Sequence, residues 1–520
     1  MKKSLKRAVA VSAVCAAGLA GTLTTTTTAT ADEAAERGSG KISNFGMKAL
    51  TFGTRLDVGG VTVKTLKDAS TIQACTRSLD LTRRAPSNLS TDQITAMLGD
   101  SLPVDIAELI HLSPSTSSTE TYQTPDGVTG VRAVNTIADI QIGGEVIDNI
   151  SIPTIKIEGL KSVADSFHDP ADKDGDGKKF GTAESFGFGE LSLLLPEDGV
   201  IGETLNMLLE ALGFSTEEIN EGINELINVP LGILVDTLQQ IIDTAGLGDV
   251  IEIPGLGSIG LGSSFSKKKA NFAASGANAL KIEVNPEGVE NGGVAALKLG
   301  YAQSRISSPV RSGVFRSSIM GLDFKALPLL NDVEALHMGG IGTQSIECEG
   351  TGGELVKKTI QGSRSIPLGV VDGLDLGLVK LTGLEYAYKA KQMARKRARS
   401  TARSTLGTLE IPVFGLTIKG IQSKMTLRSK LGERVKGSNK PQFKVLTIEQ
   451  NGENLIPDGI RVGDIVEFVT ENVGDGTGII SFGKIRKRNY FGAQVSAVNV
   501  TIPGLATLDL GWLESQIYPR

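Results

Sequence analysis

Aromatic residues are scarce in this 520-residue sequence. They make up 4% of the chain, with one Trp and six Tyr. Exposed aromatic rings are large contact surfaces for sugars, so the supply is thin for a carbohydrate-binding module. That role stays open as an alternative, and it would gain support if Tyr386, Tyr388 and Tyr490 lay on one face. The scarcity also predicts a core packed by Val, Ile, Leu and Ala.

Histidine and cysteine are rarer still, with three residues of each type. His111, His168 and His337 have no His or Cys neighbour at the spacing of a zinc site. The cysteines lack the local signature of a catalytic nucleophile, and no Gly-x-Ser-x-Gly elbow is present. We therefore assign no catalytic residue and expect a non-enzymatic protein. An extracellular hydrolase remains a second alternative, because a sequence cannot place two carboxylates across a cleft.

The first 31 residues have the pattern of a secretory signal peptide. Four basic residues precede an apolar stretch over 8–23, and a small-residue cleavage site lies at 29–31. The apolar stretch is too short and too rich in Ala for a membrane span, so we expect no transmembrane segment after cleavage. The sequence thus predicts a secreted, extracellular protein, either free or associated with the cell wall.

An overall excess of positive charge is also lacking. The formal net charge of −5 would become −9 once the four basic residues of the signal peptide are removed. This acidity argues against general nucleic-acid binding. Two basic clusters stand out, with seven Lys and Arg in 389–403 and four in 484–488. They could contact an anionic cell-envelope polymer or the acidic face of another surface protein, or they could be solvated surface.

Two cysteines remain after signal cleavage, Cys75 and Cys348. An exported protein with two thiols can join them in a disulfide, and two buried free thiols are the alternative. The disulfide would close a loop of 273 residues. The chain-entropy model gives roughly 5 kcal/mol for loops of that order.

One acidic turn resembles the start of a calcium-binding loop. Asp172, Asp174 and Asp176 alternate and are followed by Gly177. The twelfth position of such a loop would be Ala183, where a Glu is needed. A solvated hairpin turn, for which Asp and Gly are ordinary residues, is the alternative to a weak calcium site. We expect no other cofactor.

Alternating strands are the dominant pattern, and they recur. The segment 152–162 comes back at 411–423, and both copies run into Gly-(Leu/Ile)-x-Ser. Related glycines stand at similar places in other strands, at Gly300, Gly342 and Gly383. This self-similarity predicts one structural unit used several times. We expect a mainly β protein made of repeated long antiparallel hairpins that form sheet or sandwich bodies. The expected hairpins pair 156–167 with 180–195, 295–304 with 315–330, 339–349 with 357–367, 378–393 with 403–413 and 416–430 with 442–451.

Residues 201–245 break the β pattern. Their Leu and Ile recur at helical spacing, which predicts a helical insertion that covers one face of a sheet. The segment 385–403 fits either a basic helix with an alanine stripe or two strands, and its flanks favour strands. We divide the chain into several parts. They are a signal peptide over 1–31, a flexible leader over 32–43, a first β body over 44–252, a Gly/Ser/Lys junction over 253–270 and a second β body over 271–520.

The signal peptide and the Gly/Ala/Ser-rich alternating strands with Gly-x-x-Ser units resemble the choice-of-anchor P family of secreted bacterial proteins. The resemblance covers about 44–450 and implies surface display without an established activity, so no functional residue is carried over. The C-terminal residues 512–520 depart from wall-anchored proteins, because they lack a Leu-Pro-x-Thr-Gly motif, an apolar span and a basic tail. The sequence predicts an exported, non-enzymatic structural or adhesive protein of the bacterial cell surface.

Overall fold

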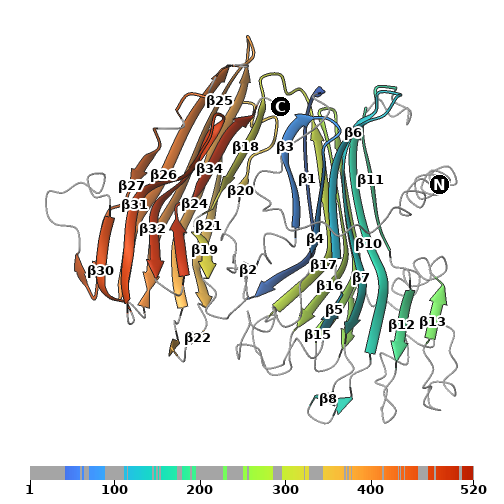
Figure 1. Cartoon of the computed structure of the whole chain (residues 1–520), viewed down its shortest axis with the longest axis horizontal. Helices are drawn as coiled ribbons and strands as arrows, with labels where there is room; N and C mark the ends of the chain where they lie inside the picture. The colour runs from blue at the N-terminus through green and yellow to red at the C-terminus, as the bar shows by residue number, and fades with distance from the viewer. Residues whose placement is uncertain are drawn as a thin grey trace. The chain divides into compact units, whose positions relative to one another are not determined.

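The computed structural model of the chain (Figure 1) describes most of the residues between 41 and 518. The described ranges are 41–58, 61–63, 70–87, 110–113, 115–142, 146–147, 150–151, 154–171, 179–187, 190–194, 227–230, 250–253, 257–284, 295–320, 322–326, 344–367, 370–371, 374–375, 378–412, 415–430, 433, 435–437, 440–454, 467–473, 476–502 and 506–518.

Every element in these ranges is a strand, and all strand pairs are antiparallel. Burial alternates along the strands, as in β25 (Arg397–Ile411), because successive side chains point to opposite faces of a sheet. The prediction of a mainly β protein with antiparallel sheets is confirmed.

Sheets I and II pack on each other in the first part of the fold. Sheet I has the order β14 (Val250–Ile253), β15 (Gly257–Lys269), β16 (Phe272–Val284), β17 (Ala295–Ser307), β1 (Ile42–Val58), β2 (Val61–Val63), and β3 (Ser70–Ser78) also pairs with β1. Sheet II has the order β13 (Ile227–Pro230), β12 (Glu190–Leu194), β10 (Thr154–His168), β7 (Thr129–Ile142), β6 (Ser115–Gln123), β4 (Thr82–Ser87), with β11 (Phe180–Gly187) on β10 and β5 (Ile110–Leu112) on β7. Their shared core is rich in Ala, including Ala133 and Ala164 from sheet II and Ala273 and Ala302 from sheet I.

Sheets III and IV enclose a larger apolar core, which includes Phe315, Tyr386, Ile418 and Leu513. Sheet III has the order β19 (Leu322–Ala326), β33 (Ala506–Leu510), β32 (Gly492–Ile502), β34 (Leu513–Tyr518), β18 (Val314–Ile319), β20 (Gln344–Ser345), and β31 (Gly476–Arg488) joins β32 to β30 (Glu467–Val473). Sheet IV has the order β21 (Val356–Pro367), β24 (Leu378–Met393), β25, β26 (Leu416–Lys430), β28 (Thr447–Gln450), β29 (Glu453–Asn454), with β27 (Gln442–Lys444) on β26. Two small ribbons pair β8 (Val146–Ile147) with β9 (Ile150–Ser151) and β22 (Val370–Val371) with β23 (Leu374–Asp375).

Several predicted hairpins are present. Strand β10 pairs with β11 and β12, β24 pairs with β25, and β26 pairs with β27 and β28. Segment 385–403 forms strands, which confirms the preferred interpretation.

Two other predicted hairpins are wrong. Strand β17 does not turn back onto the following β18, because it pairs with β1 and β16 while β18 pairs with β34. Likewise β20 pairs with β18 and β21 with β24, so these two strands do not form the hairpin expected of 339–349 and 357–367. The link 308–313 carries the chain out of sheet I instead of reversing it, with Ser308 donating to the carbonyl of Asn271 and Val310 to that of Asn44. Pro309 has no N–H for a ladder, which disfavours a hairpin there.

The strand pairing also connects segments on both sides of the predicted junction. Residues 257–269 of the expected junction form β15, and β16 and β17 complete one sheet with β1, in which Gly46 faces Ser307. Figure 1 shows β1 running beside β17. A Gly/Ser-rich composition suggests a linker, but small residues also suit a strand of a sheet whose core is built from small side chains. The expected leader ends within β1, which begins at Ile42.

The helical insertion predicted over 201–245 lies almost wholly outside the described residues. The four that are described, 227–230, form β13 instead of a helix and pair with β12. Pro230 is tolerated there because β13 is the last strand of sheet II in the described part of the chain.

The repeated Gly-x-x-Ser unit is a single structural device used twice. Gly159 in β10 and Gly420 in β26 both have a φ of 65°, a left-handed conformation that favours glycine. Three residues later, Ser162 donates to the carbonyl of Gly300 at 2.5 Å, and Ser423 donates to that of Gly511. Both acceptor glycines also have positive φ. Each unit therefore ties its strand to a glycine carbonyl of another sheet or turn.

Candidate functional site: a basic sheet face

The register of sheet IV gathers cations from three strands on its outer face. Lys391, Arg399 and Arg428 stand directly opposite one another on β24, β25 and β26. The next row pairs Arg397 with Lys430. All five side chains are exposed. We define the basic face as Lys389, Lys391, Arg397, Arg399, Arg403, Lys424, Arg428 and Lys430.

The inner residues of the same strands explain this orientation. Ala398, Ala402 and Leu406 alternate with the cations of β25 and are buried in the core of sheets III and IV. Because the side-chain period of a strand is two, burial of this apolar row presents every cation of β25 to solvent. The basic face extends roughly 20 Å along the strands and about 10 Å across three of them.

The turn between β24 and β25 adds two more cations. Met393 pairs with Arg397, and the turn residues Arg395 and Lys396 have φ values of 57° and 53°. A non-glycine residue in this left-handed region costs roughly 1–2 kcal/mol, and hairpin turns normally use Asn and Gly there. Local strain of this kind is often retained for function. The sequence thus places charge at a point where an uncharged turn would be more stable.

Few acids offset this charge. In the described residues, Glu385 binds Arg403 and lies 3.9 Å from Lys357, while Glu433 binds Lys430 at 2.6 Å. The hydrogen bond from Lys430, together with its charge, lowers the pKa of Glu433 below its ordinary value.

The central row is different, because Lys391, Arg399 and Arg428 make no ion pair within the described part of the chain. Like charges in direct register destabilise a sheet by a few tenths to about 1 kcal/mol. An anion bound across this row would remove that repulsion. The central row therefore suits an extended anionic partner.

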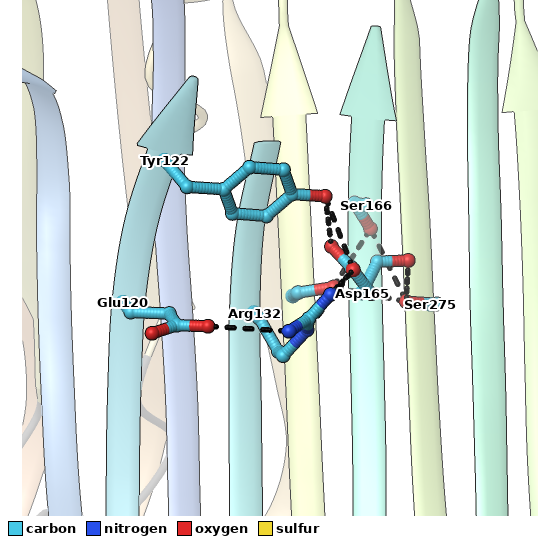
Figure 2. Close-up of polar contacts among 7 residues, drawn as sticks. Glu120, Tyr122, Arg132, Asp165, Ser166 and Ser275 are labelled. Carbon is cyan, nitrogen blue, oxygen red and sulfur yellow. Dashed lines mark hydrogen bonds and ion pairs between the residues drawn. The ribbon is translucent and has the colours of Figure 1, made fainter. Parts of the chain in front are cut away.

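In a second charged cluster, on the outer face of sheet II, the charged side chains form ion pairs and hydrogen bonds with one another (Figure 2). Glu120, Arg132 and Asp165 stand opposite one another on β6, β7 and β10. Arg132 donates to Asp165 through Nη2 at 2.8 Å and Nε at 3.1 Å, and to Glu120 at 3.3 Å. The Tyr122 hydroxyl donates to the other oxygen of Asp165 at 2.9 Å.

Burial governs the protonation of this cluster. The side chain of Asp165 is only 7% exposed, and this burial raises its pKa above the ordinary value, while Arg132 and Tyr122 oppose the rise. Burial and the nearby Asp165 raise the pKa of Tyr122 far above its ordinary value. The Tyr122 ring lies over Gly130, where a Cβ would come within 2.3 Å of the hydroxyl oxygen. With both carboxylate oxygens already hydrogen-bonded, Asp165 is held in place as a structural ion and is poorly placed to act as a general base.

The other sequence-predicted residues lie apart. Cys75 and Cys348 form a disulfide, which is one of the two outcomes that the sequence left open. The calcium candidates Asp172, Asp174 and Asp176 lie outside the described residues. Residues 484–488 belong to β31 in sheet III, not to sheet IV, and their side chains are not described.

The tyrosines are not gathered on one exposed face. Tyr386 and Tyr388 are 0% and 7% exposed in the core between sheets III and IV, whereas Tyr490 is 49% exposed. The arrangement that would have favoured a carbohydrate-binding role is therefore not present.

No family model, curated protein or solved structure matches this chain. The resemblance to choice-of-anchor P proteins stays a prediction. In the described ranges, no group of three or more His, Cys, Asp or Glu side chains could hold a metal ion. The same ranges contain no helix long and apolar enough to cross a membrane.

Five of the eight residues of the basic face lie in a run that could be recognised in the sequence. The run 389–403 was visible as a cluster, but Lys424, Arg428 and Lys430 are spread along another strand. Their alternate positions on β26 were the available signal, and the register of β26 with β25 brings the two sets together.

Proposed function

We propose that this chain is an exported, non-enzymatic structural or adhesive protein of the bacterial cell surface, and that its basic face holds an anionic partner. The observation that supports this most directly is the row Lys391–Arg399–Arg428, in which three exposed cations stand in register and make no ion pair with an acid of the described ranges. The strained Arg395–Lys396 turn, which extends the charge beyond the strand ends, gives further support.

The chemistry of the face suits a polymer that carries phosphate or carboxylate groups. Arg guanidinium groups bind such groups in a bidentate manner, and Lys supplies flexible point charges. Rows repeat about every 7 Å along the strands and cations about every 5 Å across them, so one polymer could engage several rows. Cell-envelope polymers with repeating phosphates or carboxylates have this chemistry. Binding of this type weakens as salt screens the charges.

The test compares two charge-reversal variants of the full chain. The site variant carries Lys391→Glu, Arg399→Glu and Arg428→Glu. The control variant carries Lys156→Glu, Lys179→Glu and Lys268→Glu, which changes the net charge by the same amount at exposed positions in sheets I and II or beside them.

The cells that export each form are fractionated into medium, wall and membrane, with and without a high-salt wash. Retention of purified mature protein on immobilised polyphosphate is measured over a salt series. We expect the site variant to move to the medium and to bind polyphosphate at least tenfold more weakly, since three cationic contacts are reversed. The control should behave like the wild type. Unchanged wall retention of the site variant would refute the role of the basic face.

A further inference from the structure

The charges of this chain are segregated along the sequence. Residues 180–266 contain fourteen Asp and Glu and no Lys, Arg or His. Residues 354–454, which include all of sheet IV, contain nineteen Lys and Arg against eight Asp and Glu. These two segments carry formal charges of −14 and +11, although the whole chain is only −5. Each segment repels itself and is complementary to the other.

The described strands of the acidic segment do not belong to sheet IV. Strands β11, β12 and β13 lie in sheet II, and β14 and β15 lie in sheet I. The basic face is therefore not paired with any described strand of the acidic segment in its own chain. A second copy of the chain carries the same acidic segment and can present it to this face.

We propose that the basic face of one molecule binds the acidic segment 180–266 of a second copy, giving head-to-tail self-association. This inference rests on the proposed function of the basic face as an anion contact, and it names the partner. The contact is heterologous, because it joins two different surfaces of the same molecule. Each bound copy leaves one basic face and one acidic segment free, so association continues into rings or filaments unless the geometry closes it.

The proposed contact has three expected properties. It should weaken steeply with salt, because the Debye length falls from about 30 Å at 0.01 M to about 8 Å at physiological ionic strength. It should depend on the central row Lys391–Arg399–Arg428, which the described acids leave unpaired. Met393, which is 42% exposed beside the basic face, offers an apolar contact for the leucines and isoleucines of the acidic segment.

The experiment uses sedimentation velocity on the mature full chain over a concentration series at 20 mM and 500 mM NaCl. The basic variant carries Lys391→Gln, Arg399→Gln and Arg428→Gln, and the acidic variant carries Glu217→Gln, Glu218→Gln, Glu221→Gln and Glu225→Gln. We expect the wild type to associate at 20 mM and to dissociate at 500 mM. Each variant alone should associate at least tenfold more weakly.

Mixing the two variants provides the decisive measurement. The acidic variant keeps an intact basic face and the basic variant keeps an intact acidic segment, so an equal mixture should form dimers at 20 mM NaCl and stop there. Wild type that is monomeric at 20 mM would overturn the inference, as would a mixture that stays monomeric. Circular dichroism of each variant separates lost binding from lost folding.

The same variants separate this inference from the proposed function. If the wild type is monomeric while the basic variant is lost from the wall fraction, an anionic polymer is the partner and only the self-association is refuted. A monomeric wild type whose acidic variant binds polyphosphate more tightly would mean that the acidic segment covers the basic face within one chain, which also refutes self-association. Retention of the basic variant on the wall, together with salt-sensitive association, would refute the envelope contact and keep the inference.

Discussion

The guanidinium of Arg132 makes two hydrogen bonds to a single oxygen of Asp165, at 2.8 Å and 3.1 Å. The two residues face each other on neighbouring strands of sheet II, and Tyr122 binds the second oxygen. This arrangement neutralises a carboxylate that is almost completely buried on the outer side of the sheet. Removing Arg132 should therefore lower the free energy of unfolding more than is usual for an ion pair on the outer side of a sheet.

Substitution of Arg132 by Met should lower the free energy of unfolding by about 3 kcal/mol, because it leaves a buried carboxylate without its counter-charge. Chemical denaturation at pH 7.5 measures this loss. Glu120→Gln is the matched control and should cost less than about 1 kcal/mol, since Glu120 is 42% exposed. Equal losses for the two variants would contradict the assigned role of Asp165.

The same variant should show an altered pH dependence. Burial already raises the pKa of Asp165, and loss of Arg132 removes the larger of the two groups that oppose this rise. The folded variant then binds a proton at a pH where the unfolded chain does not, so its stability falls as pH rises above the ordinary Asp value of 3.8. The deficit of Arg132→Met relative to the wild type should be smaller at pH 4.5 than at pH 7.5. A deficit that is constant with pH would show that lost packing, not the charge, is responsible.

The disulfide should contribute substantially to stability. It joins β3 in sheet I to Cys348, next to Glu347 and Glu349, which bind Arg305 at 2.8 Å and 2.7 Å. The variant Cys75→Ala/Cys348→Ala should lose up to roughly 5 kcal/mol, the chain-entropy value for a loop of this size. The denaturant midpoint with and without a reductant measures this effect. The reductant should lower the wild-type midpoint and leave that of the variant unchanged.

The two Gly-x-x-Ser units should be energetically equivalent. Ser162→Ala and Ser423→Ala each leave a buried glycine carbonyl without its donor and should cost about 1–3 kcal/mol. Ser264, which is exposed on β15, supplies the control and should change stability by less than about 0.5 kcal/mol as Ser264→Ala. If only one of the two substitutions lowered the stability, the two Gly-x-x-Ser units would not have the same structural role.

The turn that joins β24 and β25 should be more stable without its cations. Replacing Arg395 with Asn and Lys396 with Gly suits the left-handed backbone, and thermal unfolding should show a gain of about 1 kcal/mol. Retention on polyphosphate should fall at the same time. The control Arg395→Ala/Lys396→Ala removes the charges and keeps the strain, so it should lose binding without gaining stability. Higher stability with unchanged retention on polyphosphate would show that the turn cations do not contribute to binding by the basic face.

The lowered pKa of His168 should make the protein less stable in weak acid. It lies between Phe45 and Phe180, at 4.7 Å and 5.0 Å between ring centroids, and burial followed by the charge of Lys179 lowers its pKa below 6.5. The unfolded chain therefore binds a proton more readily, so this contribution is present above pH 6.5 and is lost as pH falls below it. In His168→Phe, the dependence between pH 7.5 and 5 should flatten. An unchanged slope would assign the pH dependence to other groups.

The sequence predicted the strands better than their partners. Alternation is local, so it located β10, β24 and β26, and short turns identified the hairpins that they form. No local signal links residues 261 positions apart, such as Gly46 and Ser307, so the pairing of β1 with β17 across the predicted junction at 253–270 could not be predicted. The site followed the same pattern. The cations of 389–403 were visible in one run. The placement of Arg399 opposite Arg428, and of Arg132 opposite Asp165, depends on strand register.

The pairing of β1 with β17 has a consequence for biogenesis. Strand β1 cannot complete its sheet until residue 307 has been made and has reached the same compartment. Closing a loop of this length carries a high entropic cost before any contact is gained, and such non-local pairing folds slowly. For a chain that is threaded unfolded through a membrane, this delay is an advantage. In the export that we propose for this chain, the order of the strands would delay the completion of sheet I during translocation.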